Sequence, residues 1–299
     1  MYEQLAAEER REANESGELG QGADLVISNQ DASIYKHTCS LHDLTHLSKR
    51  RDCAVCNRAK LLYVPARKFA NQSALRQHEQ QRFKAIEAFE LLFMDLKVIR
   101  KGSRGSVHEV SFNILDAFTG SSRTYRLLKH DMNAIRGCLL HFCGRRRGRF
   151  IIRGHSDHAG EIQKACEDLG WICEPSAANR PVHNPFAERN IQTVTMAARC
   201  LLVQSGLPVA RFWADAESHF TTACFFSTPS KCDPTIPKSM ALVGLTFEGH
   251  SIPFGALIHY KTDPKKLPHS HSPLSKPGLF LGWVLGPNHR WTRLYKVLD

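Results

Sequence analysis

The 299-residue sequence is 42% apolar and carries 40 lysine and arginine residues against 29 aspartate and glutamate residues, a formal net charge of +11. This length and composition exclude a disordered protein and allow one sizeable core with smaller modules beside it. Because no uninterrupted apolar run reaches the roughly 18 residues of a membrane-spanning helix, a membrane role is not expected, and the positive charge favours nucleic acid as the partner.

Residues 1–34 are polar, acidic at first and then rich in glycine and serine, and show no sustained apolar period. They are predicted to form a flexible lead-in. The N-terminus has no basic start followed by an apolar stretch, so no secretory signal is expected and the ten cysteines are expected to be reduced.

Residues 35–82 begin with a dense group of histidines and cysteines and continue as a basic, glutamine-rich connector. His42 and His46 are four residues apart, and Cys53 and Cys56 have the spacing of a zinc knuckle. The four side chains are therefore predicted to bind Zn²⁺, with His37 or Cys39 as a possible replacement for one ligand. The alternative is a basic loop with ordinary surface histidines.

The next segment alternates between predicted strands and helices. Residues 88–100 read as a buried strand, and residues 107–118 alternate in polarity before a turn at Thr119 and Gly120, which together predict a hairpin. A short apolar strand is expected at residues 149–152, ending in Arg-Gly-His-Ser-Asp. Apolar residues then recur at helical spacing up to Gly170; they are Ile162, Ala165, Cys166 and Leu169.

A long helix is predicted from Asn184 and Pro185 to Gly206, because asparagine caps free amides and proline fits the first helical position. Its apolar stripe contains Ile191, Val194, Ala198, Leu201 and Leu202, and its polar face contains Glu188, Gln192, Thr195 and Arg199. A further helix is expected around residues 212–226. Strand-like runs at 256–260, 278–285 and 291–298 predict a small β-module.

Three acidic residues lie at the ends of these elements. Asp95 interrupts an apolar strand, Asp157 ends another, and Glu188 is near the start of the long helix. A carboxylate in an apolar strand is costly unless it is paired or binds a cation, and Mg²⁺ prefers such oxygen ligands. Taken singly, each acid has an ordinary alternative: a surface residue, a turn residue, and a helix N-terminal acid favoured by the macrodipole. Asp116, Glu87 and Glu90 also compete with Asp95.

The spacing and the flanking residues of these acids resemble a known family. Sixty-one residues separate Asp95 from Asp157, and thirty separate Asp157 from Glu188. The run His155-Ser156-Asp157-His158-Ala159-Gly160-Glu161 and the run from Asn179 to Asn190, which includes Asn184-Pro185-Phe186-Ala187-Glu188-Arg189, resemble the second and third acidic motifs of copia-type retrotransposon integrases. The family usually has Asn-Gly at the position of Asn184-Pro185, and retroviral-type integrases have a longer interval before the glutamate.

The resemblance extends over about residues 40–299 and implies an α/β, RNase H-like core: a mixed five-stranded sheet with flanking helices. It implies that Asp95, Asp157 and Glu188 are the catalytic carboxylates and hold Mg²⁺ or Mn²⁺. The histidine–cysteine segment resembles the HHCC zinc module that precedes the core in integrases.

The C-terminal run Pro277-Gly278-Leu279-Phe280-Leu281-Gly282-Trp283 resembles the segment that follows the copia core. Lys261, Lys265 and Lys266 are candidates for phosphate contact there. For the aromatic residues Phe280, Trp283 and Trp291, the alternative is that they fill a small core, and we favour this alternative because large rings are readily buried.

The expected domains are a lead-in (1–34), the zinc module and connector (35–82), the RNase H-like catalytic core (83–227) and the C-terminal β-module (228–299). The resemblance implies a nuclear, homo-oligomeric integrase that processes DNA 3′ ends and transfers them into target DNA. Alternatives are a catalytically inactive, element-derived nucleic-acid-binding protein and an RNase H nuclease of RNA–DNA hybrids. Residues expected to contact DNA are Arg145, Arg146, Arg147, Arg149, Arg180, Asn184, Arg189, Gln192 and Arg199.

Overall fold

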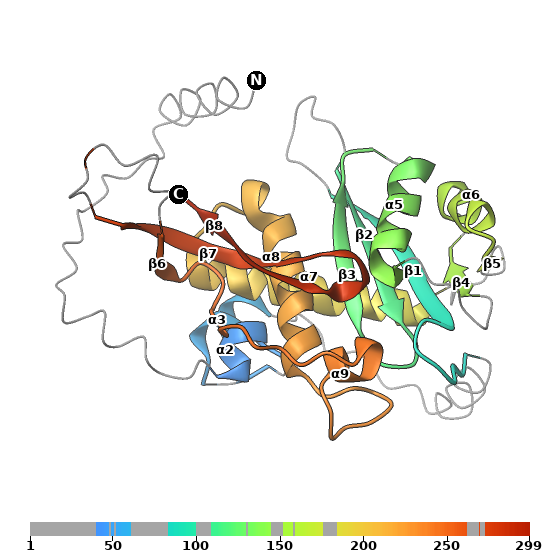
Figure 1. Ribbon diagram of the computed structural model, residues 1–299, viewed down its shortest axis with the longest axis horizontal. Coiled ribbons are helices and arrows are strands. Elements are labelled where there is room, and N and C mark those ends of the chain that lie inside the picture. The colour runs from blue at the N-terminus through green and yellow to red at the C-terminus, as the bar shows by residue number, and fades with distance from the viewer. Residues whose placement is uncertain are drawn as a thin grey trace. The chain divides into compact units, whose positions relative to one another are not determined.

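The structure is a computed structural model that describes residues 40–47, 49–50, 52–60, 83–99, 109–129, 131–144, 152–157, 159–175, 184–261, 269 and 273–299. Its main sheet has the strand order β3-β2-β1-β4-β5 (Figure 1). The strands are β1 (Leu91–Val98), β2 (Val110–Asp116), β3 (Ser122–Leu127), β4 (Arg153–Ser156) and β5 (Ile172–Pro175). The first three are antiparallel neighbours, whereas β4 and β5 run parallel to β1.

Helices flank this sheet and follow it in the chain. They are α5 (Met132–Cys143), α6 (Gly160–Asp168), α7 (Pro185–Ser205), α8 (Val209–Ser227) and α9 (Lys238–Val243). A mixed five-stranded sheet in this order, with its helices, is the RNase H-like arrangement, and the predicted fold class of the core is confirmed.

The central strand β1 is buried on both faces, which explains its continuous apolar run. Leu92 and Met94 lie in the same hydrophobic cluster as residues of α5 and α6. Phe93 lies in a different cluster, with Ala187 of α7. Because side chains alternate along a strand, Asp95 follows Phe93 on the face that α7 covers.

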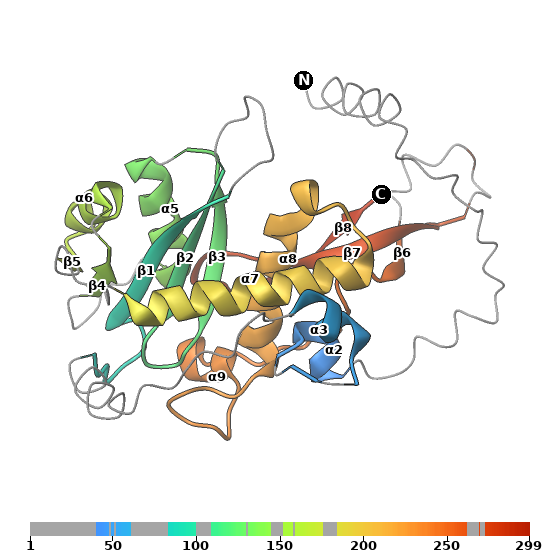
Figure 2. The same cartoon turned by 180° about the vertical axis from the view of Figure 1, so that it is seen from behind.

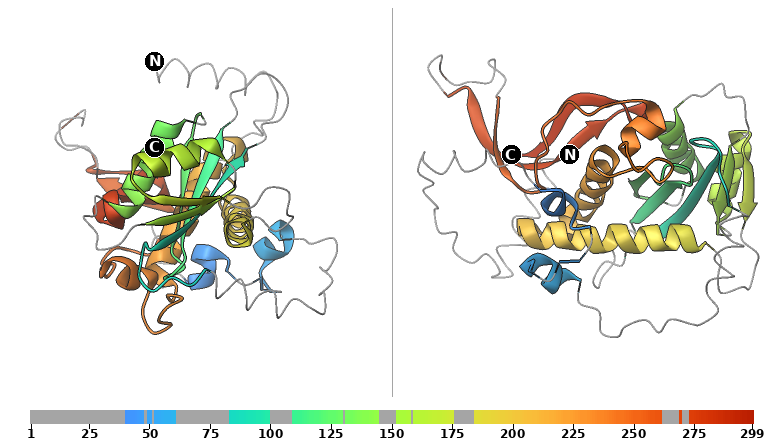
Figure 3. Two further views of the ribbon diagram at one scale, coloured as in Figure 1. Left: turned by 90° about the vertical axis from the view of Figure 1, so that its right-hand side faces the viewer. Right: turned by 90° about the horizontal axis from the view of Figure 1, so that it is seen from below.

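Helix α7 begins and ends as its sequence predicts. The side chain of Asn184 accepts a hydrogen bond from the Ala187 amide at 3.3 Å, and Gly206 at φ 69° closes the helix. Beyond the sheet, the distal half of α7 packs against α8, with Val194, Leu201 and other residues in one cluster (Figure 3). The helix therefore joins the edge of the sheet to a second core.

Two parts of the core differ from the expectation. For the strand expected at residues 149–152 and ending in Arg-Gly-His-Ser-Asp, the structure shows β4 at Arg153–Ser156, within that polar end; residues 149–151 lie outside the described residues. Gly154 allows a close approach within this strand, because a Cβ there would come within 2.5 Å of Met94 Cε of β1 and 3.3 Å of Cys166 Sγ of α6. Strands β3 and β5 and helices α5 and α9 were not anticipated.

Two smaller modules accompany the core. The N-terminal one contains α2 (Leu41–Thr45) and α3 (Ala54–Ala59), and α3 lies against the distal half of α7 (Figure 2). The C-terminal one is a three-stranded antiparallel sheet, which confirms the expected β-module; its strands are β6 (Leu257–Lys261), β7 (Ser275–Leu285) and β8 (Trp291–Leu298).

The aromatic residues of the C-terminal sheet fill a core, as the alternative had it. Phe280 is fully buried and Trp283 is nearly so, and both pack with Ala223 of α8. Lys265 and Lys266 lie outside the described residues. Among the described helices, none by itself has the length and apolar content to cross a bilayer; α7 and α8 meet that test only as a pair, with a 118° bend between them.

Candidate active site and metal centre

Three elements bring acidic residues to one place in the core. Asp95 lies on β1, Asp157 directly follows β4, and Glu188 lies in the first turn of α7. Strands β1 and β4 are parallel and pair Phe93 with His155, so Asp95 and Asp157 each come two residues further along in the same register. The sheet itself therefore sets the first two acids side by side.

The pKa of Asp95 responds to its burial and to the charges of the other two acids. Burial raises the pKa of Asp95 to about 6, and the negative charge of Asp157 and, more weakly, that of Glu188 add to the increase. The Leu96 amide, which donates to Asp95 Oδ1 at 2.7 Å, opposes it. Carboxylate oxygens, one of them from a partly buried acid, are a donor set that suits a hard divalent cation.

The three carboxylates are nevertheless not drawn tightly together. Among the described residues, the histidine–cysteine group has all its ligand atoms within 4.8 Å of one another. Asp95, Asp157 and Glu188 do not form a second such group. Residues 176–183, which lead into α7, lie outside the described part of the chain.

The competitors of Asp95 have structural roles. Asp116 is fully buried, and its carboxylate accepts hydrogen bonds from the amides of Phe89 and Thr119 at 2.7 Å and from the Thr119 hydroxyl. Glu90 accepts from the Ile86 amide at 2.6 Å and from Arg153 at 3.0 Å. These bonds stabilise a turn and a strand edge, so the geometry favours Asp95 as the first acid of the candidate site.

Asn184 ties the start of α7 to β1. Its Oδ1 caps the helix, and its Nδ2 donates to the Met94 carbonyl at 3.0 Å, one residue before Asp95. The side chain is 2% exposed, so it acts within the protein core. Glu188 is thus held at a fixed place relative to Asp95.

A partly buried ion pair two residues along β1 from Asp95 was not anticipated. Lys97 donates to Thr195 at 2.7 Å and to Glu217 at 3.3 Å, and Ser111 donates to the other oxygen of Glu217 at 2.6 Å. The network joins β1 and β2 to α7 and α8. The sequence offered one signal for it, since Lys97 lies two residues after Asp95 and therefore on the same strand face.

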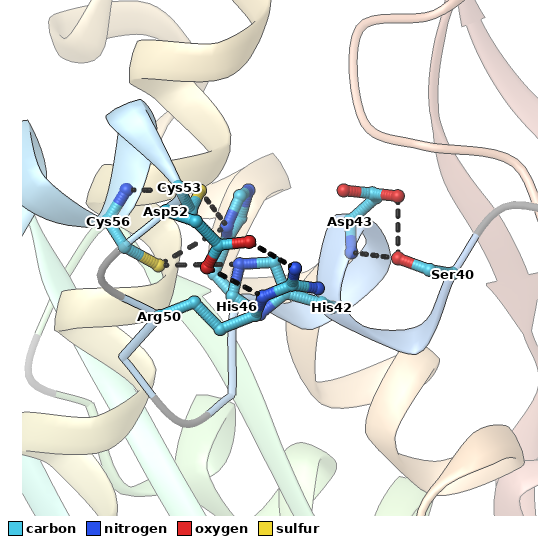
Figure 4. A network of polar contacts seen from close by, with 8 residues as sticks. All are labelled: Ser40, His42, Asp43, His46, Arg50, Asp52, Cys53 and Cys56. Atoms are coloured by element: carbon cyan, nitrogen blue, oxygen red, sulfur yellow. Dashed lines mark hydrogen bonds and ion pairs between the residues drawn. The ribbon is translucent and has the colours of Figure 1, made fainter.

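The predicted zinc ligands converge (Figure 4). Nδ1 of His46 lies 3.6 Å from the sulfur of Cys56 and 3.8 Å from that of Cys53, and Nε2 of His42 lies 3.6 Å from Cys56. Zinc–sulfur bonds of about 2.3 Å and zinc–nitrogen bonds of about 2.05 Å place tetrahedral nitrogen and sulfur ligands about 3.6 Å apart. The donor set and its spacing fit Zn²⁺.

Local structure explains how these ligands meet. Helix α2 ends at Thr45, and His46 follows it as the C-cap with φ 47°, which turns its ring back toward His42. Cys53 caps α3, with its sulfur 3.4 Å from the amide of Cys56. Burial lowers the pKa of His46, which favours the neutral imidazole that binds metal. His37 and Cys39 lie outside the described residues.

The residues expected to contact DNA fall into three groups. Arg189, Gln192 and Arg199 are exposed on α7. Asn184 is buried and bonds to Met94 and Ala187. Arg145, Arg146, Arg147, Arg149 and Arg180 lie outside the described residues. The DNA contacts stay predictions.

No family model matches the sequence, and no curated protein matches it. Structural comparison finds a chain of the simian T-cell lymphotropic virus intasome in complex with the PP2A regulatory subunit B56 gamma, at TM-score 0.42 and 13% identity over 92% of each chain. It also finds the magnesium-bound HTLV-2 integrase catalytic core domain (0.36, 12%, 48% of this chain and 90% of that one) and the BIV integrase catalytic core domain (0.35, 14%, 52% and 94%). These scores are low, and the fold is established by the sheet order.

Proposed function

We propose that this chain is a retrotransposon integrase of the copia type, a polynucleotidyl transferase that processes DNA 3′ ends and joins them to target DNA. The observation that carries the proposal is the register of β1 and β4, which sets Asp95 beside Asp157, with Glu188 in the first turn of α7. Burial raises the pKa of Asp95 to about 6, and the charges of Asp157 and, more weakly, of Glu188 add to the increase. The His42–His46–Cys53–Cys56 group ahead of the core supports it. Residues 35–82, 83–227 and 228–299 are the proposed zinc module with its connector, catalytic core and β-module.

The three carboxylates would hold Mg²⁺ or Mn²⁺. When bound, these ions supply activation of a water or a 3′-hydroxyl and stabilise the leaving oxygen during phosphodiester displacement. Asn184 bonds the start of α7 to β1, and Lys97 of β1 bonds to Thr195 of α7 and to Glu217 of α8.

The proposed partners are the element ends and target DNA, with a second copy of this chain in a homo-oligomer that works in the nucleus. Arg189, Gln192 and Arg199 line the exposed face of the helix that begins beside Glu188. Cations in this position would contact phosphates and fix the DNA register without reading its sequence.

The test is magnesium-dependent strand transfer with a short duplex that mimics a processed element end. We expect Asp157→Asn and Glu188→Gln each to lower the rate by more than about 100-fold, because losing a direct ligand exceeds the roughly 10- to 100-fold cost of losing an outer-shell partner. Glu167→Gln, an exposed acid on α6, is the matched control. Equal activity in the parent and both variants would exclude the triad.

The same assay separates the alternatives. An inactive parent that still binds DNA would identify a catalytically inactive, element-derived protein. Cleavage of RNA–DNA hybrids without strand transfer would identify an RNase H nuclease, which uses the same carboxylate chemistry.

A further inference from the structure

The two ring nitrogens of His46 have different partners. Nδ1 faces the sulfurs of Cys53 and Cys56, whereas Nε2 lies 3.0 Å from Oε1 of Gln204 on α7. An amide oxygen only accepts, so Nε2 carries the proton and donates to Gln204, which leaves the lone pair on Nδ1. Gln204 thereby sets the tautomer that a metal requires. His46 is 1% exposed whereas Gln204 is an exposed residue, so the bond is partly buried.

A second residue of α7 contacts the opposite ligand pair. Cys200 is fully buried, and its side chain lies next to that of Cys56. A thiol in this position can donate a hydrogen bond to a metal-bound thiolate and so stabilise the charge on that sulfur.

Cys200 and Gln204 are four residues apart and therefore share one face of α7. Helix α3, which carries Cys56, lies against this part of α7, and the Lys60 ammonium at its end donates to the His46 carbonyl. All of these residues belong to one compact unit of a single chain. The module thus packs on α7 through the same side chains that contact its metal ligands.

We propose that Cys200 and Gln204 form the outer shell of the zinc site, so that zinc loading and the docking of the module on α7 of the same chain are one event. Glu188 lies on the same helix, 12 residues before Cys200 and 16 before Gln204. At a rise of about 1.5 Å per residue, the zinc site therefore acts on the far end of the helix whose first turn enters the candidate active site, about 18–24 Å away. The inference rests on the zinc module of the proposed function and is independent of catalysis.

The first test is zinc transfer from the full chain to the chromogenic chelator 4-(2-pyridylazo)resorcinol. We expect Gln204→Ala and Cys200→Ala to weaken zinc binding by roughly 10- to 100-fold, the usual cost of losing an outer-shell partner. Gln204→Glu should bind zinc at least as tightly as the parent, because a carboxylate accepts the His46 proton more strongly than an amide does. Gln163→Ala, the same residue type on α6, is the matched control and should bind zinc as the parent does.

The second test is hydrogen exchange of the full chain before and after chelation of zinc. Exchange should accelerate in the last two turns of α7, around residues 198–205, and stay unchanged in α5, which reports that the core remains folded. In Gln204→Ala, the acceleration should already be present in part while zinc is bound.

The outcomes distinguish this inference from the proposed function. If both alanine variants hold zinc like the parent, or if α7 does not respond to chelation, the outer shell is wrong while the zinc module stands. If the parent binds no zinc, both the module and its outer shell are wrong. If zinc behaves as expected and strand transfer is absent, the outer shell stands and the catalytic proposal fails.

Discussion

Among the residues of the candidate site, Asp95 is the one whose burial affects the stability of the fold most clearly. An acid with an unfolded pKa of 3.8 and a folded pKa of about 6 binds more protons in the folded state between these values. The free energy of unfolding of the magnesium-free protein therefore falls as pH rises through this window, and it stays lower above pH 6.

Asp95→Asn should remove this penalty, because asparagine keeps an oxygen for the Leu96 amide and carries no charge. A shift of two pKa units corresponds to about 3 kcal/mol, and partial exposure reduces the expected gain to about 1–2 kcal/mol at pH 7.5. Urea unfolding in magnesium-free, zinc-loaded buffer between pH 5 and 8 measures it. The stability difference should grow up to about pH 6 and then level off; a pH-independent difference would contradict the assignment.

At the scale of single residues, the sequence indicated the ligand types better than their surroundings. Asp116 and Asp95 both lie on predicted strands, and pattern alone could not separate them, because the bonds that occupy Asp116 come from backbone amides of a turn. Asn184 was expected both to cap α7 and to contact DNA. Its burial depends on the neighbouring Met94 carbonyl, which sequence spacing does not reveal.

Among the elements, α7 depends on Asn184 for both its start and its position. Asn184→Ala removes the cap and leaves the Met94 carbonyl without this donor, so the free energy of unfolding should fall by about 2 kcal/mol. Asn184→Asp keeps the capping oxygen and loses the donor, so its free energy of unfolding should lie between those of the parent and the alanine variant. Circular dichroism during urea unfolding measures both. Equal stability of all three proteins would show that neither bond matters.

The predictability of the elements follows from how each is buried. Long apolar runs or stripes indicate strand β1 and helices α7 and α8 in the sequence, and the caps at Asn184 and Gly206 mark the ends of α7. Strand β4 is short and polar, and it is buried by parallel pairing to β1 rather than by its own hydrophobicity. Strand β3 has the sequence Ser-Arg-Thr-Tyr-Arg-Leu, whose polar residues conceal its pairing with β2.

At the scale of the whole molecule, the net charge of +11 explains a nucleic-acid partner only if the basic residues responsible lie together on one surface. Arg189 and Arg199 are exposed on α7 and are the described candidates. Replacing both with alanine should weaken binding to duplex DNA and lower the salt slope of log affinity by about 1.8, at about 0.9 per phosphate contact. Fluorescence anisotropy across a range of salt concentrations measures the slope.

The control carries the same change in net charge elsewhere. Lys164 on α6 and Arg290 before β8 are also exposed, and replacing both with alanine should leave the slope near the parent value. If both double variants lower the salt slope of log affinity equally, DNA binds a diffusely basic surface and α7 has no special part in it.

The claim that Asp95, Asp157 and Glu188 form one metal site is tested most directly by calorimetric titration of the zinc-loaded chain with Mn²⁺. We expect the parent to bind and Asp95→Asn, Asp157→Asn and Glu188→Gln each to weaken that binding by at least about 10-fold, with Glu167→Gln unchanged. If all three variants bind Mn²⁺ as the parent does, the carboxylates do not share a metal and the proposed active site is wrong.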